Sequence, residues 1–232
     1  SMIKQKYTQE DVAMHFDTLS PIYDSGKTKN SYYYLKLKQS LRKYIPTGCK
    51  VLEIGCGTGE ILMDLKPEKG VGIDISAKMI EQCQHKYPQG TWVHSDIVRF
   101  TERTQEEFDV IVIADTVEHV ADLPALFACL PKVSQANTRI VISMANPLWS
   151  HFLILVERLK LKLPEGPHKR YSFRYIHSLL SAQGLALTRR EFSLLLLKNI
   201  PLLTPIAEIL ERAPFIRRLC FLELLVYEYK SE

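Results

Sequence analysis

Residues 51–62 read VLEIGCGTGEIL, an apolar run that passes into glycines at positions 55, 57 and 59 and then turns acidic. Glycine-rich turns of this kind join a β-strand to a helix in nucleotide-binding α/β folds. A dinucleotide loop of the type G-x-G-x-x-G, counted from Gly55, would place its third glycine at position 60, where this chain has Glu60. A carboxylate there would repel a pyrophosphate by roughly 1 kcal/mol even in a solvated site. The loop therefore predicts a cofactor without phosphate groups.

Strand-like and helical patterns alternate on both sides of this loop. Apolar runs cover 50–54, 70–75, 91–94, 108–114 and 139–144, with helical periodicity at 58–66, 77–87 and 122–135. Helical patterns at 5–18 and 31–45 precede them, and a helix at 172–183 leads to strands at 185–197 and 220–229. Strands that alternate with helices are typical of parallel sheets. The pattern predicts an α/β, Rossmann-like, doubly wound fold with a seven-stranded, mostly parallel sheet.

The chain has 232 residues, which predicts one sheet domain with additions rather than two independent domains. Residues 1–45 are expected to form a helical cap over the cofactor site, and residues 46–232 the domain that binds the cofactor. Insertions are predicted at 148–171 and 199–219, and the three prolines of the second predict at best one or two short, broken helices there. Segments that follow parallel strands emerge at the carboxyl edge of the sheet, so both insertions are expected near the substrate.

Composition limits the class of protein. Hydrophobic residues make up 46% and charged residues 24%, which is ordinary for a globular chain. The five cysteines show no CxxC or metal-ligand spacing, which predicts reduced thiols, no metal site and a cytoplasmic location. The polar amino-terminal region predicts no secretory signal, and no apolar run reaches the length of a membrane span.

The spacing Glu53-x-Gly55-x-Gly57-x-Gly59 resembles the glycine loop of the class I S-adenosylmethionine-dependent methyltransferases. Their cofactor, S-adenosyl-L-methionine, carries a sulfonium cation and an ammonium group, which suit a carboxylate at Glu53. Glycines let the backbone approach the methionine moiety without Cβ clashes. The resemblance implies that Glu53, Gly55, Cys56, Gly57 and Gly59 bind this cofactor.

Acidic residues at the ends of the second and third strands extend the resemblance. Asp74 follows the loop by about 20 residues, where a carboxylate can accept both hydroxyls of a ribose, and Ile75 lies beside it. Asp96 follows the third strand. The resemblance implies that Asp96 and the backbone amide of Ile97 bind the adenine edge.

The fourth strand ends at Asp115 and Thr116, which by the same resemblance line the methyl-transfer pocket. An imidazole titrates near neutrality and can take a proton from an acidic hydroxyl, so His119 and, after it, His168 are the candidate catalytic bases. The alternative for His119 is that it caps or packs the following helix. Tyr23 either closes over the cofactor or only packs, and both interpretations stay open.

Three further stretches resemble the small-molecule methyltransferases of ubiquinone and menaquinone biosynthesis. They are HFDTLSPIYD at 15–24, VEHV at 117–120 and PHKRYSF at 167–173. This resemblance implies a methyltransferase that acts on a small molecule, with oxygen favoured over carbon or nitrogen. A nucleic-acid acceptor is disfavoured, because no Asn/Asp-Pro-Pro-aromatic motif follows the fourth strand and the basic residues lack interleaved aromatics.

The basic charge is concentrated in the last third of the chain. Residues 147–232 carry 13 Lys/Arg against 8 Asp/Glu, whereas residues 1–146 carry 17 against 18. The leucine-rich segments 148–163 and 199–219 and their edges contain Arg158, Lys160, Lys162, Lys198, Arg212, Arg217 and Arg218. Such segments suit a lipid-linked acceptor or peripheral contact with an anionic membrane. A hydrophobic lid and a dimer contact are the alternatives. The sequence does not specify the oligomeric state.

Two other functions stay open. A catalytically inactive relative would bind S-adenosyl-L-methionine as a structural or sensing ligand. The acidic residues at the strand ends would be the same in such a protein as in an enzyme, so they do not distinguish the two. A nicotinamide-dependent oxidoreductase is disfavoured by Glu60.

Overall fold

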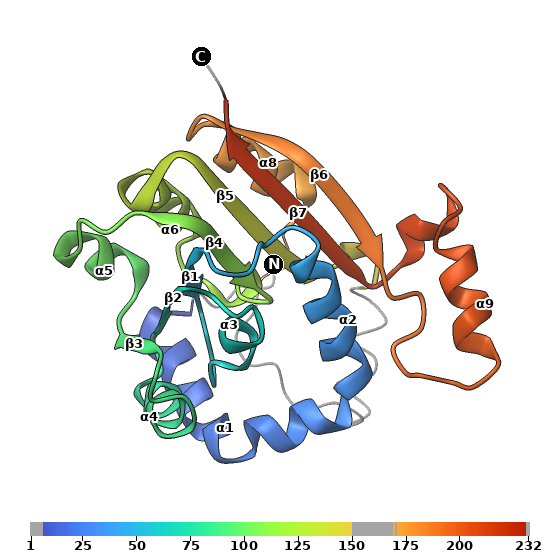
Figure 1. Cartoon of the computed structure of the whole chain (residues 1–232), viewed down its shortest axis with the longest axis horizontal. Coiled ribbons are helices and arrows are strands. Elements are labelled where there is room, and N and C mark those ends of the chain that lie inside the picture. The colour runs from blue at the N-terminus through green and yellow to red at the C-terminus, as the bar shows by residue number, and fades with distance from the viewer. Residues whose placement is uncertain (1–6, 150–168, 170, 231–232) are drawn as a thin grey trace, which may run out of the picture.

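The computed structural model describes residues 7–149, 169 and 171–230, and it contains a seven-stranded sheet covered by helices (Figure 1). The strands are β1 (Lys50–Ile54), β2 (Lys69–Asp74), β3 (Thr91–His94), β4 (Phe108–Ala114), β5 (Ser134–Ala145), β6 (Leu185–Ser193) and β7 (Leu222–Tyr229). Their order across the sheet is β3-β2-β1-β4-β5-β7-β6. Neighbours among β1 to β5 are parallel, and β7 runs antiparallel to both β5 and β6. The predicted doubly wound, mostly parallel sheet is confirmed.

Helices pack on both faces of the sheet because its central strands are apolar on both sides. The helices are α1 (Gln9–Lys29), α2 (Ser31–Arg42), α3 (Glu60–Asp64), α4 (Ala77–Lys86), α5 (Ile97–Arg103), α6 (Leu123–Cys129), α8 (Phe173–Ser181) and α9 (Leu203–Leu210), with 3-10 turns η1 (Val117–His119), η2 (Leu130–Val133), η3 (Pro147–Trp149) and η4 (Ile216–Leu219). On β4, Ile111 and Ile113 pack with α5, α6 and α8, whereas Val110 and Val112 pack with α2, α3 and α4. This two-sided burial is typical of parallel strands.

The first helix is longer than its sequence pattern predicts. It begins after Thr8, which caps it, and the expected helix at 5–18 continues without a break through Pro21 to residue 29. Proline removes one backbone donor and normally ends a helix. Here the Gln82 amide of α4 donates to the carbonyl oxygen of Ser20 at 2.7 Å, and such tertiary contacts hold the second half of α1 in place.

Three regions of the chain were predicted as additions to the sheet: the amino-terminal cap and two insertions. α1 and α2 occupy the region expected to form the cap at 1–45, and that division of the chain stays a prediction. Most of the insertion at 148–171 lies outside the described residues, whereas 199–219 forms α9 and η4 after β6. Within the described ranges, no helix has the length and apolar character needed to cross a bilayer. All five cysteines are unpaired, as predicted.

Candidate functional site

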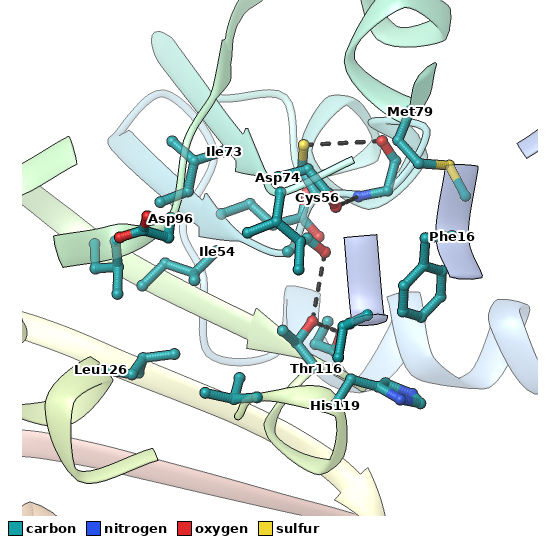
Figure 2. A pocket seen from close by; sticks show the side chains of 18 of the residues that line it. Phe16, Ile54, Cys56, Ile73, Asp74, Met79, Asp96, Thr116, His119 and Leu126 are labelled. Carbon is teal, nitrogen blue, oxygen red and sulfur yellow. Dashed lines mark hydrogen bonds between the residues drawn. The ribbon is translucent and has the colours of Figure 1, made fainter. Parts of the chain in front are cut away.

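A pocket lies at the carboxyl edge of the sheet between the ends of β1 and β4, where the strand order reverses. Open α/β sheets bind ligands at this point. Together with its open mouth the pocket measures about 1110 Å³, and α1 contributes Phe16, Tyr23 and Lys27 to its wall. Figure 2 shows Asp96 at one end of the pocket, and Phe16 beside His119 at the other.

Most of the predicted cofactor residues come together here. Those that line the pocket are Tyr23, Glu53, Gly55, Cys56, Gly57, Asp74, Ile75, Asp96, Ile97, Asp115 and Thr116. His119 lines it as well, whereas His168 lies outside the described residues.

The glycine loop needs its glycines for backbone conformation and for close packing. Gly55, Gly57 and Gly59 have φ angles of +76°, +53° and +77°, a region that side chains rarely tolerate. A Cβ atom on Gly55 would lie 2.4 Å from the Thr116 side chain, and one on Gly59 would lie 2.5 Å from the Trp92 ring. Gly55 and Gly57 border the pocket, while Gly59 packs against the indole and caps α3.

Glu53 is a buried carboxyl at the end of β1. Its side chain is 1% exposed, and its Oε2 accepts the backbone N–H of Leu62 at 3.1 Å. Burial raises the pKa of Glu53 to about 8, although the nearby Lys27 opposes that rise. Burial thus favours the neutral carboxyl, and a cation that enters the pocket would favour the carboxylate.

Glu60 does not line the pocket, although its position after the glycine loop predicted that a bound pyrophosphate would meet its carboxylate. It forms ion pairs with Lys27, at 3.8 Å, and with Lys38. These two cations lower the pKa of the Glu60 carboxyl and compensate its charge. The carboxylates in the pocket wall, rather than Glu60, therefore determine the charge that a ligand meets.

Asp74 connects the ends of β1 and β2. Its Oδ2 accepts the backbone N–H of Gly57 at 2.8 Å, and its Oδ1 accepts that of Ser76 at 2.9 Å. Desolvation raises the pKa of Asp74 to about 6, against these two hydrogen bonds that lower it. At neutral pH the group is an ionised acceptor with lone pairs directed at the pocket.

Asp96 and Ile97 form the pocket wall at the end of β3. Asp96 caps α5, because its Oδ1 accepts the backbone N–H of Arg99 at 2.9 Å. Ile97 is 5% exposed and packs into the core beneath the pocket.

Asp115 holds a strained backbone conformation at the end of β4. Its φ is +49°, which costs a non-glycine residue on the order of 1 kcal/mol or more. Its Oδ2 accepts the hydroxyl of Tyr33 at 2.6 Å and its Oδ1 that of Ser143 at 2.8 Å. The neighbouring Thr116 hydroxyl donates to the carbonyl oxygen of Ala114 at 2.8 Å. Contacts from α2 and β5 therefore hold Asp115 in place.

Aromatic side chains enclose the pocket from α1. The ring of Phe16 meets the His119 ring edge-on, with 5.2 Å between the ring centroids, and lies 6.4 Å from the Tyr23 ring. Burial raises the pKa of Tyr23 well above its usual value, so its hydroxyl stays protonated.

The pocket wall also contains four residues that were not predicted from the sequence, namely Phe16, Lys27, Tyr34 and Asp122. Lys27 is 8% exposed, and its Nζ lies 4.9 Å from the Tyr23 ring centroid and 5.1 Å from that of Tyr34. Burial lowers the pKa of Lys27, whereas Glu60 and Glu53 raise it. On an unbroken α1, positions 16, 23 and 27 share one helix face, so their spacing is the signal that could have found them.

The charge of the pocket wall favours a cation. Its acidic members are Glu53, Asp74, Asp96, Asp115 and Asp122. Among the described lining residues Lys27 is the one lysine, and arginine is absent. No group of three metal-ligating side chains occurs in the described ranges. The arrangement suits a positively charged ligand with hydroxyl groups better than a pyrophosphate.

Comparison with known proteins identifies a family and several relatives of this chain. The family described as "Methyltransferase domain" matches residues 27–190, more than half of the chain. The ubiquinone biosynthesis O-methyltransferase of Pasteurella multocida (strain Pm70) is 32% identical over 142 residues, which cover 53% of this chain and 58% of the relative. The human mitochondrial enzyme of the same name is 26% identical over 174 residues, covering 65% and 47%. The chain thus spans about half the length of these relatives.

Solved structures share the fold at low sequence identity. A magnesium protoporphyrin IX methyltransferase from Synechocystis PCC 6803, with bound SAH, has a TM-score of 0.59 and 18% identity, covering 85% of this chain and 84% of its own. A SAM-dependent methyltransferase from Thermotoga maritima has a TM-score of 0.68 and 15% identity, covering 94% and 100%.

Proposed function

Because this chain belongs to the methyltransferase-domain family, we propose that it transfers the methyl group of S-adenosyl-L-methionine to a small, hydrophobic or lipid-linked acceptor. The observation that carries the proposal is the acidic pocket around the glycine loop at the strand-order reversal. The sulfonium and ammonium groups of this cofactor are cations, and its ribose offers two hydroxyl donors.

The residues in the pocket fit the parts of this cofactor. Asp74 would accept the ribose hydroxyls, since each of its oxygens has already one backbone donor and retains a lone pair. Gly55, Gly57 and Glu53 would bind the methionine part, whose ammonium favours ionised Glu53. Asp96 and the Ile97 amide would bind the adenine.

The chain's own contribution to the reaction is positioning, exclusion of water and removal of a proton. S-adenosyl-L-methionine supplies a methyl group that its sulfonium has already activated. Phe16 and Tyr23 line the pocket, and their aromatic rings would keep water from the reacting atoms. A hydroxyl acceptor also has to lose its proton, and a ring nitrogen of His119 would accept it from within the pocket wall. His168 stays an alternative candidate for this role.

We favour oxygen as the methylated atom and an apolar, lipid-linked acceptor that is reached at a membrane surface. Relatives named ubiquinone biosynthesis O-methyltransferase support this choice. The leucine-rich, basic segment 199–219 supports it as well, since it follows β6 at the same edge of the sheet as the pocket. The other segment named from the sequence, 148–163, lies mostly outside the described residues.

Transfer of a labelled methyl group tests the proposal. The chain is incubated with methyl-labelled S-adenosyl-L-methionine and hydroxylated aromatic acceptors with and without a prenyl tail, and the product is identified by mass spectrometry. An aryl methyl ether is expected, with turnover reduced roughly 100-fold in His119→Asn. The exposed His85 provides the matched control, His85→Asn, which should keep full turnover. Cofactor binding without transfer to any acceptor would instead identify the inactive alternative.

A further inference from the structure

The insertion between β6 and β7 carries large apolar side chains on the outside of the molecule. In Figure 1 the orange and red segment with α9 stands away from the sheet. Phe215 is 87% exposed, Leu202 84% and Ile209 64%. Together with Leu203, Ile206, Leu210 and Leu219, these residues form what we call the α9 surface. Apolar groups gathered in one segment at this exposure indicate an interaction site.

The helix α9 has its small residues inside and its large ones outside. Thr204 and Ala207, three positions apart, are its buried residues, at 8% and 6% exposure. At about 100° per residue, the exposed Leu203, Ile206 and Ile209 lie within an arc of about 120°, whose centre is about 130° around the helix from that of the buried pair. A helix that only covers a core directs its large apolar side chains inward. The α9 surface is therefore built to contact something other than its own sheet.

Charge separates in the same way across this segment. Its two acids point to the body of the protein, since Glu208 forms an ion pair with Lys36 of α2 and the Glu211 carboxylate accepts the backbone N–H of Leu195 at 2.8 Å. The arginines of this segment, Arg212, Arg217 and Arg218, are exposed. Within the described parts of the chain, none of the three forms an ion pair. The outer face therefore combines apolar groups with uncompensated positive charge.

Hydrogen bonds attach this surface to the end of β5 and to α2, two elements whose side chains also bind Asp115 in the pocket wall. The Asn146 amide, after β5, donates to the carbonyl oxygens of Arg218 and Cys220, each at 2.8 Å. On the other side, α2 binds α9 through Lys36 and, one turn earlier, donates the Tyr33 hydroxyl to Asp115 in the pocket wall. The α9 surface and the pocket therefore share one edge of the sheet.

We propose that the α9 surface docks on an anionic lipid bilayer, with Phe215 and Leu202 entering the headgroup region and the arginines contacting lipid phosphates. The combination of exposed apolar groups and exposed cations is the one that interfacial membrane segments present to anionic lipid. The inference deepens the proposed function, because a docked chain would present its pocket edge to a lipid-linked acceptor. Docking itself requires no methyl transfer, so the two are tested separately.

Co-sedimentation of the whole chain with vesicles tests the docking. Vesicles of phosphatidylcholine alone are compared with vesicles containing 30% phosphatidylglycerol, an amount chosen to be roughly that of an anionic membrane surface. We expect binding to the anionic vesicles that weakens as salt increases, because surface charge is screened. Arg217→Gln/Arg218→Gln should weaken it roughly 30-fold, and Leu202→Ser/Phe215→Ser should weaken it at least as much.

Matched controls use exposed residues elsewhere. Met14→Ser, at 63% exposure on α1, and Arg103→Gln on α5 should leave vesicle binding unchanged. Equal binding to neutral vesicles, absence of vesicle binding, or a dimer that Leu202→Ser/Phe215→Ser dissociates would each overturn the proposal. All variants should still bind S-adenosylhomocysteine. If wild type docks but binds no S-adenosylhomocysteine, the proposed function fails while the docking stands; the reverse result rejects the docking alone.

Discussion

Replacement of Asp74 by asparagine tests the geometry of the cofactor site most sharply, because it keeps the volume and removes the charge. The Asp74 carboxylate accepts two backbone N–H groups, from Gly57 and Ser76, and one amide oxygen cannot replace both acceptors. Loss of one charge-assisted hydrogen bond would lower the free energy of unfolding by about 2 kcal/mol, but burial raises the pKa of Asp74, so removal of the buried charge offsets part of that loss. Loss of the acceptor for two ribose hydroxyls should cost a further 2–3 kcal/mol, roughly, in cofactor binding, or about 30- to 150-fold in Kd.

Calorimetric titration with S-adenosylhomocysteine at pH 7.5 measures the binding, and urea unfolding measures the stability. The matched control is Asp64→Asn, since Asp64 forms an ion pair with Arg42 away from the pocket and should leave the Kd unchanged. Because the pKa of Asp74 is about 6, wild-type affinity should fall toward that of the Asp74→Asn variant as pH drops below 6. An Asp74→Asn affinity within twofold of wild type would refute this account of the ribose site.

Three other substitutions probe the pocket wall and the glycine loop. The folded-state pKa of Glu53 is about 8 against 4.5 for the exposed group, so ionisation of this carboxyl destabilises the fold as pH rises across that window. Between pH 4 and pH 9, the free energy of unfolding of Glu53→Gln should therefore gain on the order of 4–5 kcal/mol relative to wild type, measured by urea unfolding. A pH-independent difference would contradict it. Gly48 and Gly59 both have a positive φ, but of the two only Gly59 would place a Cβ against Trp92. Gly59→Ala should therefore lower the melting temperature clearly more than Gly48→Ala does. Equal shifts in melting temperature would count against the packing role of Gly59. The buried Lys27 would bind the carboxylate of the methionine part, so Lys27→Met should weaken S-adenosylhomocysteine binding at least roughly fivefold. Binding of 5′-methylthioadenosine, which lacks that carboxylate, should not change. Parallel losses for both ligands would reject Lys27 as the carboxylate partner.

The sheet was predictable because its signal is local. The runs at 50–54, 91–94 and 108–114 match β1, β3 and β4, since continuous apolar sequence between turn residues suffices to specify buried parallel strands. The glycine loop was predictable for the same reason, because a positive φ at Gly55 leaves few other residue types.

Features that depend on distant partners were not predictable. Continuation of α1 past Pro21 depends on contacts with α4, and without it Phe16 and Lys27 could not be placed on one helix face. The strained conformation of Asp115 depends on hydroxyls supplied by Tyr33 and Ser143, from elements far away in the sequence. Local propensity carries no information about such contacts.

Cofactor binding is the measurement that tests the central claim most directly. The chain is titrated calorimetrically with S-adenosylhomocysteine and, in parallel, with NADH, at a pH above 8 where Glu53 is ionised. The acidic pocket predicts micromolar binding of S-adenosylhomocysteine and no measurable binding of the pyrophosphate-containing NADH. Binding of NADH, or no binding of S-adenosylhomocysteine, would contradict the assignment of this pocket to a methyl-donor cofactor.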